Sequence, residues 1–198
     1  KGSGFLVNKD KGLILTNAHV TGRSKSKVRV AFKNYGFSPV KQVYVDPRID
    51  IAIVQINPKL IPIEAKEAKL KCDGKVPSGT SVAAFGHPKD LSFSASRGIV
   101  SKYRFFGGKD VIQTDTAINK GNSGGPLIDM NTGLVIGVNK SSYTKSSGLS
   151  FAVPSKNVCI ILNLFNEGKN PSPIKLPIRF AEDREAEDYL KISSFYHK

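Results

Sequence analysis

Cysteine is scarce in this sequence, which narrows the kinds of fold and site it can form. Only two cysteines are present, Cys72 and Cys159, and two do not make a disulfide-rich scaffold. Neither has a partner at the spacing of zinc ligands, so no Cys/His metal site is predicted. Cys159 lies in the apolar run Val-Cys-Ile-Ile-Leu and is expected to be buried, whereas Cys72 lies in a polar turn. We therefore favour two unpaired cysteines, with a bridge between them as the alternative.

Long apolar runs and acidic residues are also few. No stretch of about 18 apolar residues occurs, so no membrane-spanning helix is predicted. Lysine and arginine number 30 against 16 acidic residues, a net charge of +14 that would suit contact with an anionic surface. We favour a lysine-rich soluble surface instead, because the lysines are scattered among loops. Motifs of nucleic-acid-binding modules are absent, so nucleic acid is not an expected partner.

What the sequence has in abundance is short apolar or alternating segments separated by turn residues, the pattern of an all-β barrel or sandwich. Near residue 155 the period changes, and apolar residues recur at helical spacing up to a glycine stop at Gly168. A helix is predicted over 155–166, and a second, exposed one over 181–190. The predicted strands are 4–7, 13–16, 28–32, 41–45, 51–56, 81–85, 92–96, 98–102, 111–114, 127–129, 135–139 and 149–153.

The chain is expected to divide within residues 58–75, which are rich in lysine, glutamate and proline. This linker separates an N-terminal β-barrel, 1–70, from a C-terminal β-barrel with its helix, 71–166. Residues 167–198 form a tail.

Three segments carry candidate catalytic groups. Ser123 lies in the glycine-rich turn Gly-Asn-Ser-Gly-Gly, His19 follows an apolar strand, and Asp50 precedes another. A serine nucleophile needs an imidazole to take its proton and a carboxylate to orient that imidazole. Each segment alone could be structural. The serine run could be a flexible turn, the histidine could be a structural residue with its hydrogen bonds made, and the aspartate could cap a turn. Together, in the order His, Asp, Ser, they indicate a peptide-bond hydrolase.

The remaining candidates follow from the same chemistry. The backbone N–H groups of Gly121 and Ser123 are expected to form the oxyanion hole, where a side chain at Gly121 would crowd the substrate. Asp46 suits a turn-capping role better than a catalytic one. His87, in a Gly-His-Pro turn, and His197, near the chain end, are poor candidates for the base.

These segments resemble the HtrA/Deg family of chymotrypsin-like serine proteases. The resemblance implies two six-stranded antiparallel β-barrels, with His19 and Asp50 from the first and Ser123 from the second. It also implies an extracytoplasmic endopeptidase, periplasmic or secreted, that degrades unfolded or damaged proteins, is often a homotrimer and needs no metal or organic cofactor. The matching motifs are Gly-Ser-Gly-Phe at 2–5, Leu-Thr-Asn-Ala-His-Val at 15–20, Asp-Ile-Ala-Ile-Val at 50–54, Gly-Ile-Val-Ser at 98–101, Gln-Thr-Asp-Thr-Ala-Ile-Asn at 113–119, Gly-Asn-Ser-Gly-Gly-Pro-Leu at 121–127, Gly-Val-Asn at 137–139 and Leu-Ser-Phe-Ala-Val-Pro at 149–154.

The chain departs from this family in two respects. Too few residues follow the predicted helix for the PDZ domain that the family usually carries. The family's N-terminal segment, which supplies the opening strand and commonly builds the trimer, does not precede Lys1. We therefore expect a protease domain without PDZ, a first barrel lacking its opening strand, and a monomer as an alternative to the trimer.

Substrate preference follows in part from the resemblance. In the wider clan the residue six before the nucleophile lies at the base of the specificity pocket, and an aspartate there selects lysine or arginine. Ala117 occupies that position, so cleavage after small or aliphatic residues is predicted. Ser142 stands where an apolar residue is common. The residues expected to bind substrate are Ala117, Ile118, Asn139, Lys140, Ser141 and Ser142.

Two other functions stay open. A latent or inactive protease-fold protein could bind other proteins as a chaperone-like module, with the turn at 119–122 in an inactive conformation. A basic binding module for nucleic acid or anionic surfaces rests on the net charge alone.

Overall fold

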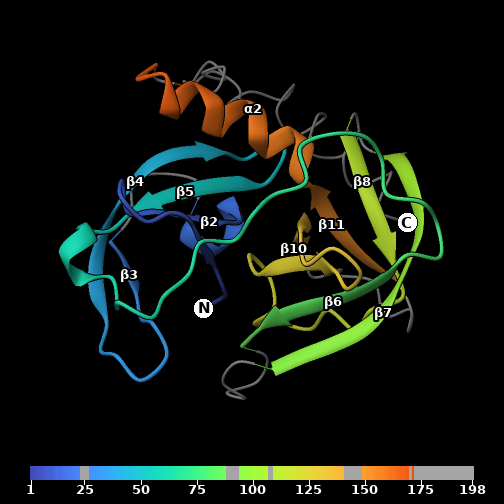
Figure 1. The fold of residues 1–198 in the computed structure, drawn as a ribbon, viewed down its shortest axis with the longest axis horizontal. Helices are drawn as coiled ribbons and strands as arrows, with labels where there is room; N and C mark the ends of the chain where they lie inside the picture. The colour runs from blue at the N-terminus through green and yellow to red at the C-terminus, as the bar shows by residue number, and fades with distance from the viewer. Residues whose placement is uncertain (23–26, 88–93, 107–108, 141–148, 170, 172–198) are drawn as a thin grey trace, which may run out of the picture.

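The computed structural model describes residues 1–22, 27–87, 94–106, 109–140, 149–169 and 171 (Figure 1). The helix predicted at 181–190 lies outside these residues. Strands dominate the described part, as predicted. The elements are β1 (Phe5–Asn8), β2 (Leu13–Thr16), α1 (Ala18–Thr21), β3 (Val28–Val30), β4 (Ser38–Asp46), β5 (Ile51–Gln55), η1 (Pro58–Leu60), β6 (Ser81–Gly86), β7 (Ser94–Phe106), β8 (Lys109–Thr114), β9 (Pro126–Asp129), β10 (Val135–Lys140), β11 (Ser150–Pro154) and α2 (Ser155–Asn166).

The N-terminal half is a five-stranded antiparallel sheet in the order β1-β2-β5-β4-β3. All of β2 and the first four residues of β5 are buried, which explains their nearly continuous apolar sequence. The register pairs Leu13 with Gln55 and Thr16 with Ala52. The end of β2 therefore lies beside the beginning of β5. Within the described residues this half has five strands, as expected without the opening strand, and not the six of a complete barrel.

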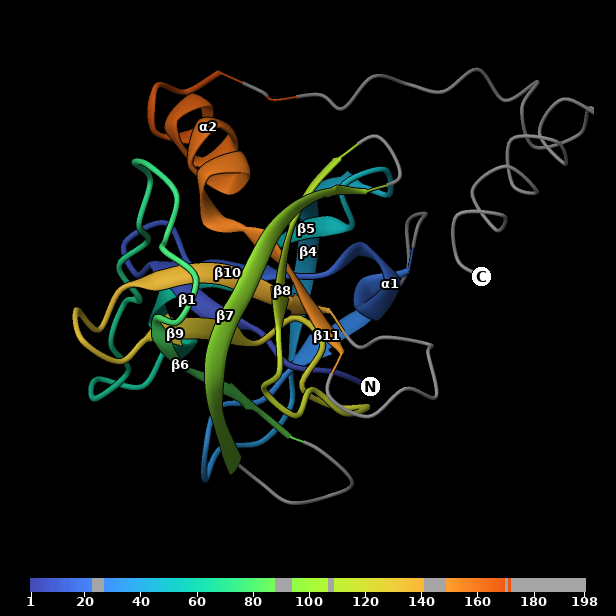
Figure 2. The same ribbon diagram turned by 90° about the vertical axis from the view of Figure 1, so that its right-hand side faces the viewer.

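The C-terminal half is a closed six-stranded barrel, as predicted, in the order β10-β11-β8-β7-β6-β9. Of the strand predicted over 92–96, the structure describes residues 94–96, and these form one long strand, β7, with the segment predicted as strand 98–102 (Figure 2). Gly98 lies within this strand. A Cβ at this position would lie 2.3 Å from Asp115 Oδ1, which explains why the residue is glycine. The core of the barrel contains Val82, Val100, Ile112, Leu127 and Ile136.

Helix α2 forms where the change of period predicted it. It lies outside the six-stranded barrel in both views (Figures 1 and 2). Its buried residues Val158 and Ile161 share one core with Leu15 and Ile53 of the N-terminal sheet and with Val138 of the barrel. The helix therefore joins the two halves of the molecule.

The preference for unpaired cysteines is wrong, because Cys72 and Cys159 form a disulfide. The linker before Cys72 lies along β10, where Lys71 N donates to Val135 O at 2.8 Å. The Ser155 hydroxyl at the start of α2 also donates to Lys71 O, at 2.5 Å. These contacts bring Cys72 beside the helix, a proximity that no local sequence pattern encodes.

Candidate active site

The antiparallel pairing of β2 and β5 brings His19 and Asp50 together. His19 lies in α1, directly after β2, and Asp50 lies directly before β5. The His19 Nδ1 atom lies 3.0 Å from Asp50 Oδ1 and 2.9 Å from Oδ2, and the His19 backbone N–H donates to Oδ1 at 3.1 Å. An ionised carboxylate can only accept, so in the neutral imidazole Nδ1 carries the proton and Nε2 is the acceptor. This is the tautomer that a general base for a serine requires.

The position of Asp50 is fixed by its backbone as well as by its side chain. Its φ of +60° lies in the left-handed region, which aspartate tolerates better than most residues. The fully buried Asn17 side chain donates to Asp50 O at 2.9 Å. Burial raises the pKa of Asp50, but the hydrogen bonds from His19 and the positive charges of Lys140 and His19 outweigh burial and lower it overall. The group is therefore ionised at neutral pH.

The turn before Ser123 has type II geometry. Asn122 N donates to Asn119 O at 3.0 Å, and Gly121, the third residue of the turn, has a φ of +106°. Type II requires a positive φ at this position, whereas type I has a negative one. The two types differ by a flip of the Lys120–Gly121 peptide, and so by the direction of the Gly121 N–H. The sequence left this choice open.

The nucleophile loop is tied to the N-terminal sheet. Ser3 N donates to Ser123 O at 2.8 Å, and Ser3 Oγ donates to Gly121 O at 2.6 Å. A Cβ at Gly124 would lie 2.2 Å from both Ser3 O and Thr16 Oγ1, and 3.2 Å from Asn17 N. Glycine at 124 therefore allows the loop to approach the segment that precedes His19. Sequence reasoning gave Ser3 no role, although its Gly-Ser-Gly motif was visible.

The predicted substrate-binding residues have different environments. Ala117 is exposed, and its carbonyl accepts from Ser96 Oγ at 2.8 Å. Ile118 is buried within the barrel core. The Asn139 side chain is fully buried, and its amide donates to Phe85 O at 3.3 Å and to Pro126 O at 3.0 Å. The Lys140 ammonium lies 3.6 Å from Asp50 Oδ2, a contact that the sequence did not suggest. Ser141 and Ser142 lie outside the described residues.

The alternative acid and base have other partners. Asp46 accepts from the backbone N–H of Arg48 and forms an ion pair with its guanidinium, both at 2.9 Å, which is the predicted turn role. His87 contacts Ser3 Oγ through its backbone N–H at 3.1 Å and through Nδ1 at 3.2 Å. Burial lowers the pKa of His87, as does the charge of Lys1. His197 lies outside the described residues.

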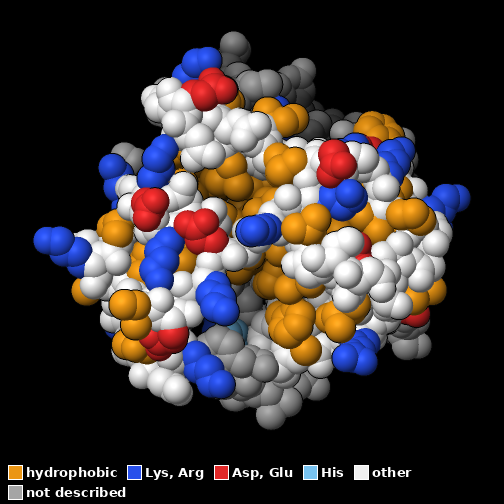
Figure 3. Space-filling model, viewed as in Figure 1, with side chains coloured by type: hydrophobic (Ala, Val, Ile, Leu, Met, Phe, Trp, Pro, Cys, Tyr) orange, Lys and Arg blue, Asp and Glu red, His pale blue; other side chains and the backbone are white. Residues whose placement is uncertain are grey.

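In the described segments, no three His, Cys, Asp or Glu side chains gather as metal ligands, and no helix is long and apolar enough to cross a membrane. Lysine and arginine side chains are spread over the face in Figure 3, among acidic and apolar ones. On this face, therefore, the basic side chains do not gather into one basic patch.

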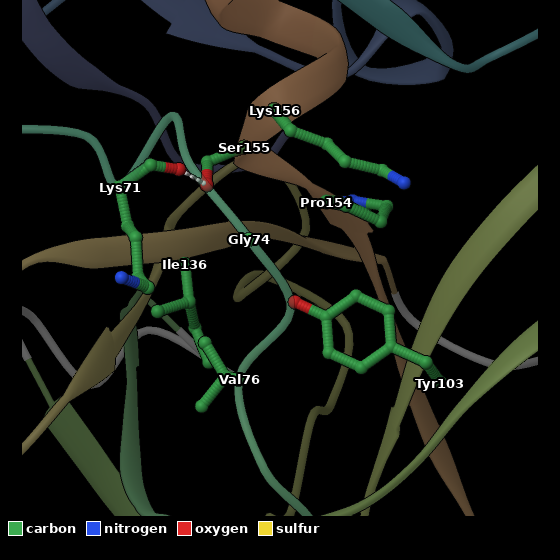
Figure 4. Close-up of a pocket in the computed structure, with 8 residues that line it drawn as sticks. All are labelled: Lys71, Gly74, Val76, Tyr103, Ile136, Pro154, Ser155 and Lys156. Atoms are coloured by element: carbon green, nitrogen blue, oxygen red, sulfur yellow. Dashed lines mark hydrogen bonds between the residues drawn. The ribbon is translucent and has the colours of Figure 1, made fainter.

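Figure 4 shows a depression where the linker meets the barrel and α2. The Tyr103 hydroxyl points toward the linker and has a backbone hydrogen bond with Val76, while burial raises the pKa of Tyr103. These contacts indicate a structural junction, and the lining includes none of His19, Asp50 and Ser123. The lining residues are Lys71, Gly74, Val76, Tyr103, Ile136, Pro154, Ser155 and Lys156.

A closed six-stranded barrel beside a second β-sheet, with a paired histidine and aspartate and a serine in a glycine-rich turn, is the arrangement of the trypsin-like class of serine peptidases. Residues 2–138 match the trypsin-like peptidase domain family. The chain belongs to this family, and the relatives and structures it resembles are HtrA/Deg serine proteases.

Two curated relatives illustrate the similarity. The serine protease HTRA1A of Danio rerio is 41% identical over 169 residues, which cover 79% of this chain and 33% of that protein. A probable periplasmic DegP-like serine endoprotease of Pseudomonas putida (strain W619) is 39% identical over 160 residues, covering 77% of this chain and 32% of the relative. The chain thus spans about a third of the length of these relatives.

Solved structures agree with the sequence matches. The HtrA-type protease AlgW with a tripeptide superposes with a TM-score of 0.72 at 30% identity, over 85% of this chain and 56% of that one. A serine endoprotease from Yersinia pestis gives a TM-score of 0.70 at 30% identity, over 85% and 58%.

Proposed function

We propose that this chain is an active serine endopeptidase that uses Ser123, His19 and Asp50 as its triad. The Ser123 Oγ attacks the carbonyl carbon of the peptide bond while His19 Nε2 takes its proton. His19 then gives that proton to the leaving amine, and a water, activated in the same way, hydrolyses the acyl-enzyme. Asp50 holds the imidazole and stabilises its charged form. The observation that carries this proposal is the pairing of His19 Nδ1 with both carboxylate oxygens of Asp50.

The geometry of the turn favours the active form over a latent one. The N–H groups of Gly121 and Ser123 would stabilise the oxyanion of the tetrahedral intermediate. The positive φ of Gly121 supports this role, because the type I alternative would turn the Gly121 N–H elsewhere. A chaperone-like binding module without catalysis is therefore the second candidate.

Substrates are proposed to be unfolded or damaged proteins and peptides. Related HtrA-type structures are described with a tripeptide and with a decapeptide. We infer cleavage after small or aliphatic residues, since Ala117 offers no negative charge to hold lysine or arginine. A map of cleavage sites dominated by lysine and arginine would contradict this preference.

Location and assembly are further parts of the proposal. An extracytoplasmic location is supported by the periplasmic DegP-like relatives and by the Cys72–Cys159 disulfide, which is typical of oxidising compartments. A homotrimer and a monomer are the two assemblies proposed, and light scattering at several concentrations distinguishes them. The division into units 1–70 and 71–166, followed by a tail, also remains a proposal.

The test is labelling with a fluorophosphonate, which reacts with an activated serine. Intact mass should show one adduct on the wild-type protein and none on Ser123→Ala, with His19→Gln labelled far more slowly. Circular dichroism of all three proteins controls for folding. A folded wild-type protein that forms no adduct would contradict the proposal of an active endopeptidase and favour the binding module.

A further inference from the structure

The carboxylate of Asp50 faces a second basic side chain besides His19. Lys140 Nζ lies 3.6 Å from Asp50 Oδ2, and the same oxygen lies 2.9 Å from His19 Nδ1. Lys140 is the last residue of β10, opposite Phe151 on β11. One carboxylate oxygen therefore contacts both the imidazole and an ammonium from the other half of the molecule.

The backbone that carries Lys140 is firmly held beside the nucleophile loop. The preceding residue, Asn139, donates its N–H to Gly125 O at 2.8 Å and accepts from Gly124 N at 2.9 Å. The Asn139 side chain is buried and hydrogen-bonded to two backbone carbonyls. The backbone at Lys140 is therefore already ordered, so only the lysine side chain must be ordered to reach Asp50.

The burial of Asp50 distinguishes this contact from an ordinary surface ion pair. Exposed pairs contribute little because water and salt screen them. Here the carboxylate side chain is only 8% exposed and the lysine side chain 31%. The attraction is consequently less screened, and its effect reaches the imidazole on the same carboxylate.

We propose that Lys140 is a positioning residue for the triad: its ammonium holds the Asp50 carboxylate ionised and opposes proton uptake by His19. This inference rests on the triad assigned above. The positive charge of the Lys140 ammonium, beside the shared carboxylate, disfavours the imidazolium. Neutral His19 therefore remains available as a base at lower pH. The protease therefore stays active further into the acidic range than it would with a neutral residue at 140.

The other charges around the pair do not substitute for Lys140. In the part of the chain that the structure describes, the charged side chains that act on the pKa of Asp50 are His19, from α1, and Lys140, from β10. On the β4–β5 turn, Asp46 and Arg48 are paired with each other. The Lys109 ammonium donates to Arg48 O at 2.9 Å.

The first test is the pH dependence of kcat/KM for Lys140→Met, Lys140→Gln and Lys140→Arg. Coulomb's law at an effective dielectric between that of a protein surface and that of bulk water gives a shift of about half a pH unit to two units. For the two neutral variants, the pH at which kcat/KM reaches half its maximum on the acidic side should rise by that amount. For Lys140→Arg, this pH should equal that of the wild type. The control is Lys59→Thr, which removes one positive charge from an exposed position in η1 and should leave the acidic side of the pH profile unchanged. The shift should shrink in about 1 M salt.

A second readout separates this inference from the proposed function. In the Ser123→Ala background, ¹⁵N NMR follows the pH at which the His19 ring signals are half shifted, with and without Lys140→Met. A change in that pH supports the charge relationship even if the wild-type protein cleaves no peptide. Acidic limbs that coincide at low salt, together with unchanged His19 signals in folded variants, would overturn the inference.

Discussion

The hydroxyl of Ser3 donates a hydrogen bond of 2.6 Å to the carbonyl oxygen of Gly121, across 118 positions of sequence. The Ser3 N–H donates to Ser123 O at 2.8 Å, and Thr16 Oγ1 donates to Ser3 O at 2.7 Å. The segment before β1 thus connects β2 to both the oxyanion turn and the nucleophile. Ser3 is only 8% exposed, so water does not readily replace these bonds.

Ser3→Ala should lower kcat by about fivefold, because loss of one such hydrogen bond costs about 1 kcal/mol and loosens the turn. KM should change little, since the oxyanion hole acts on the transition state more than on bound substrate. Steady-state kinetics with a small peptide substrate measures both values. Ser3→Thr, which retains the hydroxyl, is the matched control and should keep most of the activity. A raised KM with an unchanged kcat would assign Ser3 to substrate binding instead.

Gly121→Ala should lower kcat by about 10²–10³-fold, the effect of losing one oxyanion donor in other enzymes. Alanine disfavours a φ of +106°, so the turn should move toward type I and redirect the N–H at position 121. Binding of a peptide boronate, which imitates the tetrahedral intermediate, should weaken in parallel. Gly133→Ala is the control: Gly133 also has a positive φ, +71°, but lies in the β9–β10 turn with open space around it. The Gly133→Ala variant should lose some stability but keep its activity.

Reduction of the Cys72–Cys159 disulfide should destabilise the fold. It closes a loop with a sequence separation of 87, for which the chain-entropy model gives up to about 4.6 kcal/mol. Urea unfolding with and without dithiothreitol measures the difference. The double variant Cys72→Ser with Cys159→Ser should resemble the reduced protein and should not respond to reductant. Equal midpoints for oxidised and reduced wild type would show that the other contacts of α2 suffice.

Asp50→Asn should lower kcat by about 10⁴-fold, because an amide no longer holds His19 in the required tautomer. Its effect on stability should depend on pH. Burial raises the pKa of Asp50, yet the contacts with His19 and Lys140 outweigh it, so the folded pKa lies below the unfolded one. The stabilisation is therefore complete above the unfolded pKa and disappears as the pH falls through the folded pKa.

Unfolding of wild type and Asp50→Asn in urea, at several pH values from neutral to about 3, tests this sign. The difference in the free energy of unfolding should be largest near neutral pH and should shrink below about pH 4. A difference that stays constant across the range would mean that ionisation of Asp50 contributes nothing to folding.

Local patterns in the sequence were sufficient for much of the fold. The buried runs at β2 and β5 predicted strands, and the change of period at Ser155 predicted helix α2 to within a residue. They were sufficient because hydrophobic periodicity and glycine or proline stops act over a few residues. The candidate triad also came from the sequence, since its chemistry requires particular side chains in particular motifs.

Tertiary structure alone decided which distant segments meet. Cys72 pairs with Cys159 because the linker lies along β10, and Lys140 reaches Asp50 because β10 ends beside the N-terminal sheet. The turn at 119–122 is type II in a setting where Ser3 holds Gly121. None of these relationships has a local signature, because each depends on contacts between segments that are distant in the sequence. The sequence by itself determined the elements and the reactive groups, and packing determined their charge environment and their geometry.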